Sequence, residues 1–264
     1  MNTMLNWLGG HLARYLSLEV HVHSTAPATR AERLLATLQP GDVLLVEGNS
    51  RISTAIKYLT QSTWSHAALY VGSALANAGK NPEHCFVEAD AVEGVRSMGI
   101  SEFARLHSRI CRPVGLTPED SEKLVAFVVT RIGSQYDLRN VIDLARYLLP
   151  TPPVPLRFRR SMLALGSGDP TRAICSTLIA QAFQSIRYPI LPITYLQNDD
   201  RPGYPACLNE ILSVRHHSLF APRDFDVSPY FEVIKPTIEE GFDFHTLKWA
   251  EHSPQSNPSN YRPT

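Results

Sequence analysis

The segment around Cys175 constrains the fold more than any other part of the chain. After a short apolar start, residues 173–183 continue with apolar side chains at helical spacing, a pattern that runs through Leu178, Ile179, Ala182 and Ile186. This spacing predicts a helix with one buried face, and the Ser-Thr pair after the cysteine suits a first helical turn. Unpaired N–H groups and the helix dipole at such a position lower a cysteine pKa from about 8.5 to roughly 3.5–7.5. The sequence therefore predicts that Cys175 is a nucleophilic thiolate at a helix N-terminus.

Two strand-like segments supply partners for this thiolate. Residues 64–72 predict a strand in which His66 shares a face with Ala68 and Tyr70, and residues 84–89 predict a strand that carries Glu88. A nucleophile, a base and a carboxylate that orients the base form a triad. The alternatives are an inert buried cysteine, a structural histidine and a solvated glutamate.

The order of these motifs resembles the permuted members of the NlpC-type, papain-like cysteine hydrolases, the YiiX/YebB-like group. The resemblance spans roughly residues 38–183 and is carried by the segments 38–46, 64–72, 87–89, 132–137 and 174–179. Unpermuted relatives place the cysteine helix before the histidine strand, whereas Cys175 here follows His66. The chain departs from many relatives in its long segment before Cys175 and in Ser-Thr, rather than Ser-Glu, after it.

This resemblance implies a fold and a set of catalytic residues. The implied fold is α+β and circularly permuted, with an antiparallel sheet packed on the cysteine-bearing helix. Cys175 is implied as the nucleophile, His66 as the general base and Glu88 as the residue that orients the histidine. Tyr136 matches the tyrosine of a Gly-x-x-Tyr-Asp element that lies close to the cysteine.

The chain is predicted to have three parts. Residues 1–38 are an N-terminal helical extension, residues 39–252 are the catalytic domain, and residues 253–264 have the composition of a disordered tail. Within the domain, residues 150–172 combine prolines with an arginine cluster and predict a lid-like insertion over the site. The alternative for this segment is a solvated connector.

Local patterns predict several further elements. Helices are expected at residues 2–16, 28–38, 50–59, 118–132 and 140–149, with Thr117 capping the fourth. Further strands are expected at residues 42–47, 94–100, 109–114 and 230–234. The Pro- and Tyr-rich stretch after residue 188 gives no clear assignment.

Composition excludes several function classes. The chain has 264 residues, with 25 basic and 25 acidic side chains and a formal net charge of zero, which argues against nucleic-acid binding. Its four cysteines lack metal-finger spacing, so we expect no cofactor, no metal and a reducing, cytoplasmic location. A metal site made by Cys175, His66 and Glu88 is the alternative to a triad.

The predicted function is hydrolysis of amide or acyl bonds, either ester or thioester, through a covalent acyl-enzyme. Substrates of this chemistry are small peptides, amides or lipid-like acyl compounds. A lipid acyltransferase-like activity and a non-catalytic binding module are the alternatives. Apolar residues line one face of 1–16, so this segment or 150–172 can make a peripheral membrane contact. Docking on the protein's own domain is the alternative for residues 1–16.

Overall fold

A six-stranded antiparallel sheet forms the centre of the protein. The computed structural model describes residue 18 and residues 28–90, 93–134, 174–198 and 208–248. The strands lie in the order β4-β3-β2-β1-β5-β8, and every neighbouring pair is antiparallel. Their bounds are β1 Val43–Val46, β2 His66–Tyr70, β3 His84–Asp90, β4 Gly94–Gly99, β5 Ser108–Pro113 and β8 Phe231–Ile234.

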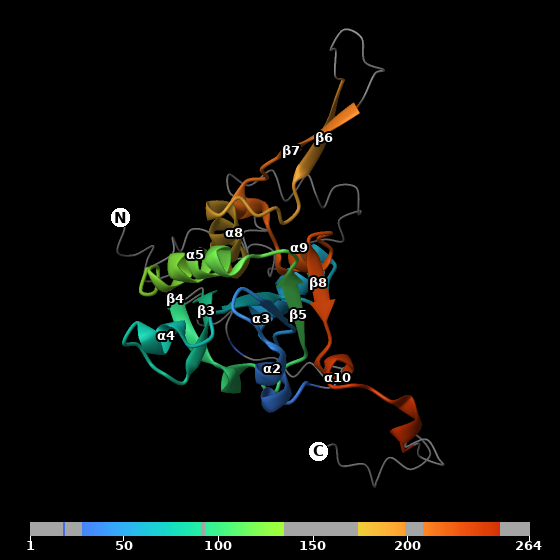
Figure 1. Cartoon of the computed structure of the whole chain (residues 1–264). Coiled ribbons are helices and arrows are strands. Elements are labelled where there is room, and N and C mark those ends of the chain that lie inside the picture. Colours follow the sequence, from blue (N-terminus) through green and yellow to red (C-terminus); the bar gives the residue numbers. More distant parts are fainter. Residues whose placement is uncertain (1–17, 19–27, 91–92, 135–173, 199–207, 249–264) are drawn as a thin grey trace.

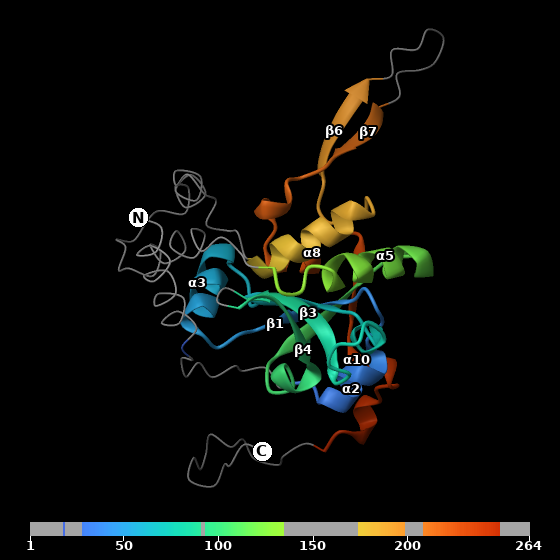
Figure 2. The same cartoon turned by 90° about the vertical axis from the view of Figure 1, so that its left-hand side faces the viewer.

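Both faces of this sheet are covered, as the uninterrupted apolar run of β1 requires. All four residues of β1 are buried, because a strand with core on both sides has no polar face. Val43 and Leu45 join one hydrophobic cluster, whereas Leu44 and Val46 join the other. The sheet therefore separates two cores, and helices lie over each of them (Figure 2).

The first core lies between the sheet and the helices α5 (Pro118–Val129) and α8 (Ile174–Ser185), which pack against each other. Leu178, Ile179, Ala182 and Phe183 of α8 are all buried in this core. The α+β fold predicted from the sequence, with the cysteine-bearing helix packed on an antiparallel sheet, is confirmed.

The second core lies on the opposite face of the sheet. The helix α2 (Ala31–Thr37) contributes Leu34 to this core, and Leu38 follows at its end. Two short elements contact α2: the helix α10 (Pro236–Glu239) and the 3-10 turn η1 (Ile100–Glu102). The helix predicted at residues 28–38 is thus present and contributes to the core of the sheet.

The helix α5 shows why one predicted boundary is wrong. Its start is as expected, because the Thr117 side chain accepts a hydrogen bond from the N–H of Asp120. Its end is Val129, three residues before the predicted one. Beyond the helix, Gly133 donates to the Val95 carbonyl at 2.8 Å and Val95 donates to the Ser134 carbonyl at 3.0 Å. Pairing with β4 therefore replaces the last expected helical turn.

The remaining elements lie around these layers. They are α3 (Arg51–Thr60), capped by Ser50, α4 (Ala74–Asn77), η2 (His217–Leu219), α9 (Pro222–Asp226) and η3 (Phe244–Thr246). The unassigned stretch after residue 188 contains an antiparallel hairpin of β6 (Ile193–Asn198) and β7 (Leu208–Ser213). This hairpin projects away from the central sheet (Figure 1).

Several predictions fall outside the described residues. These are the helices at 2–16 and 140–149, the lid-like insertion at 150–172 and the tail at 253–264. Among the helices that the structure describes, none is long and apolar enough to span a membrane.

Candidate active site

Cys175 is the second residue of α8, at the helix N-terminus expected from the sequence. The buried apolar side chains of α8 fix the helix against the sheet and therefore fix the position of its first turn. Cys175 itself is only 4% exposed. Its sulfur nevertheless has polar surroundings, which include the Ser176 hydroxyl at 3.9 Å.

A local separation of two strands brings the sheet to this sulfur. Strands β2 and β3 pair through Leu69 with Val87 and through Tyr70 with Phe86. The N–H of Ala67 lies beyond the last of these pairs, on the edge of β2 from which Val71 donates to β3. It donates a hydrogen bond to the Cys175 sulfur. Cys175, in the first turn of α8, thus accepts the hydrogen bond that a regular pairing of β2 with β3 would direct to β3.

His66, the first residue of β2, links the thiol to Glu88. Its Nε2 atom lies 2.6 Å from Oε2 of Glu88, whose side chain is 4% exposed. Because Glu88 occupies Nε2, Nδ1 is the ring nitrogen left for the hydrogen bond between His66 and Cys175. The His66 side chain is 26% exposed. The structure therefore brings together three of the four candidate residues.

A fourth side chain, which sequence reasoning missed, completes this arrangement. Arg96 lies directly opposite Glu88 in the register of β3 and β4. Its Nε and Nη2 atoms both lie 2.8 Å from Oε1 of Glu88. The signal that could have indicated Arg96 is the glycine at position 94. Gly94 has a φ of +77°, a backbone conformation that favours glycine, and it lies at the start of β4. The pairing of β3 with β4 then places Arg96 opposite Glu88.

The contacts within this group determine its charges. Burial opposes charge on Glu88, but His66 and Arg96 outweigh it and lower the pKa of the carboxyl to about 2. Burial likewise opposes charge on His66, but the negative charges of Glu88 and Cys175 raise its pKa well above the usual value. Burial would raise the pKa of Cys175, whereas His66 and the Ala67 N–H lower it. Cys175 and His66 thus each favour the charged form of the other.

Cys111 shows what burial does without such partners. It lies in β5 within the first core and is fully buried. Burial and, second, the charge of Asp226 raise its pKa to about 12. Cys111 is therefore held as a neutral thiol, and the contrast with Cys175 comes from His66 rather than from the extent of burial.

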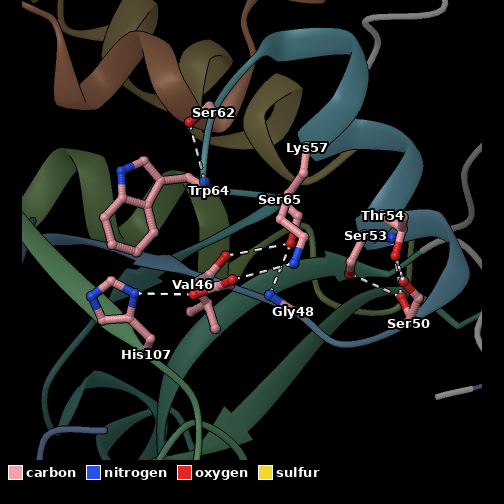
Figure 3. Close-up of polar contacts among 11 residues, drawn as sticks. Val46, Gly48, Ser50, Ser53, Thr54, Lys57, Ser62, Trp64, Ser65 and His107 are labelled. Atoms are coloured by element: carbon pink, nitrogen blue, oxygen red, sulfur yellow. Dashed lines mark hydrogen bonds and ion pairs between the residues drawn. The ribbon is translucent and has the colours of Figure 1, made fainter. Parts of the chain in front are cut away.

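A set of polar contacts fixes the start of β2, where His66 lies (Figure 3). The Ser65 hydroxyl accepts a hydrogen bond from the N–H of Gly48 at 2.9 Å, and the Ser62 hydroxyl accepts one from the N–H of Trp64 at 3.1 Å. The first bond joins the segment after β1 to Ser65, which precedes His66, and the second joins the turn before β2 to Trp64. The backbone of the two residues before His66 is thus held in place.

Trp64 fixes the start of β2 through contacts with residues of β5 and α9. Its Nε1 donates to Oδ2 of Asp226 at 3.0 Å, and Arg109 lies over its ring at 5.0 Å from the centroid. Arg109 also pairs with Asp226 at 2.6 Å. His107 packs against the indole, with ring centroids 5.0 Å apart (Figure 3). The buried indole therefore ties the histidine strand to β5 and α9.

Gly48 allows this close packing, and we expect its replacement by Ala to be costly. A Cβ atom there would overlap the Ser53 hydroxyl and lie 3.0 Å from the Ser65 hydroxyl. Gly48→Ala should lower the free energy of unfolding by about 1–3 kcal/mol, measured by urea denaturation. Gly99→Ala is the matched control, because its nearest neighbour would lie at 3.4 Å. Equal stability of the two variants would contradict the expected clash.

Two other expectations concern ligands and Tyr136. Tyr136 lies outside the described residues. Among the residues that are described, no group of three or more His, Cys, Asp and Glu side chains is arranged to hold a metal ion. Hydrogen bonds join Cys175 to His66 and His66 to Glu88.

A cysteine at the start of a buried helix, packed on an antiparallel sheet whose histidine precedes it in sequence, is the arrangement that the resemblance to the permuted papain-like hydrolases implies. Residues 37–147 match the family described as permuted papain-like amidase enzyme, YaeF/YiiX, C92 family. The matched part contains His66, Glu88 and Arg96, and Cys175 follows it. This match confirms the predicted resemblance to the YiiX-like group, and it supports an enzyme that is, at the coarse level, a cysteine hydrolase.

A similar solved structure is the metalloprotein yiiX from Escherichia coli O157:H7. It is 16% identical in sequence, with a TM-score of 0.41, and the similarity covers 75% of this chain and 96% of that one. No curated protein matches the chain.

Proposed function

We propose that this protein is a cysteine hydrolase that cleaves amide or acyl bonds, the latter ester or thioester, through Cys175, His66 and Glu88. The observation that supports this most is the position of the His66 ring, which contacts Glu88 through Nε2 and interacts with Cys175. In such a relay the carboxylate orients the ring and stabilises the imidazolium, and the imidazolium stabilises the thiolate.

The first half-reaction forms a covalent acyl-enzyme. The Cys175 thiolate attacks the carbonyl carbon of the substrate, and the carbonyl oxygen becomes an oxyanion. The N–H of Cys175 belongs to the first turn of α8, where N–H groups lack helical partners and can donate to this oxyanion. Tyr136 is proposed as a second donor. As the tetrahedral intermediate collapses, the imidazolium of His66 gives its proton to the leaving amine, alcohol or thiol.

The second half-reaction releases the acyl group. His66, now neutral, takes a proton from water, and the resulting hydroxide attacks the thioester carbon. Collapse expels the Cys175 thiolate, which restores the thiolate and imidazolium pair. An amine or alcohol in place of water would make the reaction an acyl transfer. Small peptides, amides and lipid-like acyl compounds are the proposed substrates, and residues 1–16 or 150–172 are proposed to make any membrane contact.

The test is turnover of substrate panels by the full chain. Amide, ester and thioester substrates are each incubated with wild type and with Cys175→Ala, and hydroxamate formation with added hydroxylamine reports an acyl-enzyme. We expect Cys175-dependent turnover of at least one class. Failure of wild type on every class, together with labelling of Cys175 at pH 6 no faster than that of an ordinary thiol, would overturn the proposal and favour a binding module.

A further inference from the structure

We propose that Arg96 is a positioning residue that clamps the Glu88 carboxylate against His66 and so extends the reactivity of Cys175 into the acid range. This inference concerns the regulation of the proposed site and rests on the proposed function for its meaning in catalysis. Its physical content is the orientation and ionisation of one carboxylate, which can be measured without any substrate.

The two oxygens of Glu88 are divided between two partners. Oε1 accepts from Nε and Nη2 of Arg96, both at 2.8 Å, while Oε2 contacts Nε2 of His66 at 2.6 Å. A carboxylate held in this way can neither rotate away from the ring nor swing into water. The planar guanidinium presents two N–H donors to one oxygen, which the single ammonium of a lysine does not reproduce in the same geometry.

Arg96 is in turn held by acidic groups that do not touch His66 in this network. Its Nη1 lies 2.9 Å from Oε2 of Glu93, and its Nη2 lies 3.8 Å from Oδ2 of Asp90. The Asp90 side chain also accepts a hydrogen bond from the N–H of Glu93 and so stabilises the turn of the hairpin. The arginine is therefore fixed from three sides, and its fork remains directed at Glu88.

The charged groups around Glu88 come from each element that meets it. His66 belongs to β2, Arg96 to β4 and Asp90 to the same strand β3, while Glu93 lies in the turn between β3 and β4. Cys175 of α8 acts on this set through His66. His66 and Arg96 both favour the ionised form of Glu88. Of the two, Arg96 keeps its charge throughout the pH range near neutrality.

The sign of the pH dependence follows from these partners. With His66 and Arg96 both in place, the pKa of Glu88 is lowered from 4.5 to about 2, so the carboxylate persists through the acid range and is lost only as the pH falls toward 2. Without Arg96, Glu88 should take up a proton at a higher pH. Its neutral form stabilises the imidazolium less, so the Cys175 thiolate takes up a proton at a higher pH and the residue loses reactivity there.

The experiment measures the pH dependence of Cys175 alkylation by iodoacetamide between pH 3 and 8, with the label located by peptide mass spectrometry. For Arg96→Met we expect the acid midpoint of the rate to rise by roughly 1–3 pH units. Arg96→Lys keeps the charge but loses the fork, and its midpoint should fall between those of Arg96→Met and wild type. Arg33→Met is the matched control, because it removes an exposed arginine that pairs with Glu240 rather than with Glu88, and it should match wild type.

A midpoint for Arg96→Met equal to that of wild type would overturn the inference. If Arg96→Met does not fold, as judged by circular dichroism, Arg96→Lys decides, and a wild-type midpoint for that variant has the same meaning. Because alkylation requires no substrate, a shifted midpoint in a protein that turns over no substrate would support the clamp and count against the hydrolase. Turnover by wild type, together with an unshifted midpoint for Arg96→Met, would support the hydrolase and count against the clamp.

Discussion

Replacing Cys175 by Ala should reduce turnover of any substrate that the protein cleaves by at least about a thousandfold, because residues of a catalytic relay act as a unit. Alanine removes the sulfur that would form the acyl-enzyme but fills nearly the same space at the start of α8. The fold should therefore persist, since the buried apolar residues of that helix are unchanged. Initial rates and the far-ultraviolet circular dichroism of the same preparation provide the two measurements.

The matched control is Cys85→Ala. Cys85 is a half-buried thiol in β3 outside the relay, and burial raises its pKa. The rate of this variant should be close to that of wild type. Residual turnover by Cys175→Ala within tenfold of wild type would show that another nucleophile acts and would remove the central residue of the proposed mechanism.

Replacing His66 by Asn should make Cys175 about tenfold to a hundredfold less reactive toward iodoacetamide at pH 6. A thiol with a pKa near 8.5 is only about 0.3% ionised at this pH, and burial raises the pKa of Cys175 further once the imidazolium is gone. The higher nucleophilicity of a more basic thiolate offsets part of this loss. The measurement is the alkylation rate of wild type and variant under identical conditions.

His84→Asn provides the comparison for this variant. His84 lies at the start of β3 and hydrogen-bonds Ser97 at 2.8 Å, away from the relay, so its replacement should leave the reactivity of Cys175 unchanged. Equal alkylation rates for His66→Asn and wild type would mean that the thiol does not depend on the imidazole. The thiolate and imidazolium pair would then have to be abandoned.

Periodicity and motif order were sufficient to predict the parts of the site that single segments determine. The helical pattern after Cys175 and the strand patterns around His66 and Glu88 are local, and the structure has all three elements. Sequence order also indicated the permuted arrangement that the family match supports. These features depend on side-chain spacing, which a sequence displays directly.

Arg96 and Trp64 could not be assigned in the same way. The contact of Arg96 depends on which residue β4 places opposite Glu88, and a shift of one residue would put the guanidinium on the other face of the sheet. The hydrogen bond from Trp64 reaches Asp226, far away in the sequence. Tertiary contacts also shortened the helix predicted at 118–132, because Gly133 pairs with Val95 of β4.

The separation of β2 from β3 has a consequence for how readily mutation can damage this site. The donor that Ala67 offers to Cys175 belongs to the main chain, so any residue other than proline that fits this fully buried position would supply the same group. Proline alone lacks it. Part of the polar environment of the sulfur is thus supplied by the main chain rather than by a side chain.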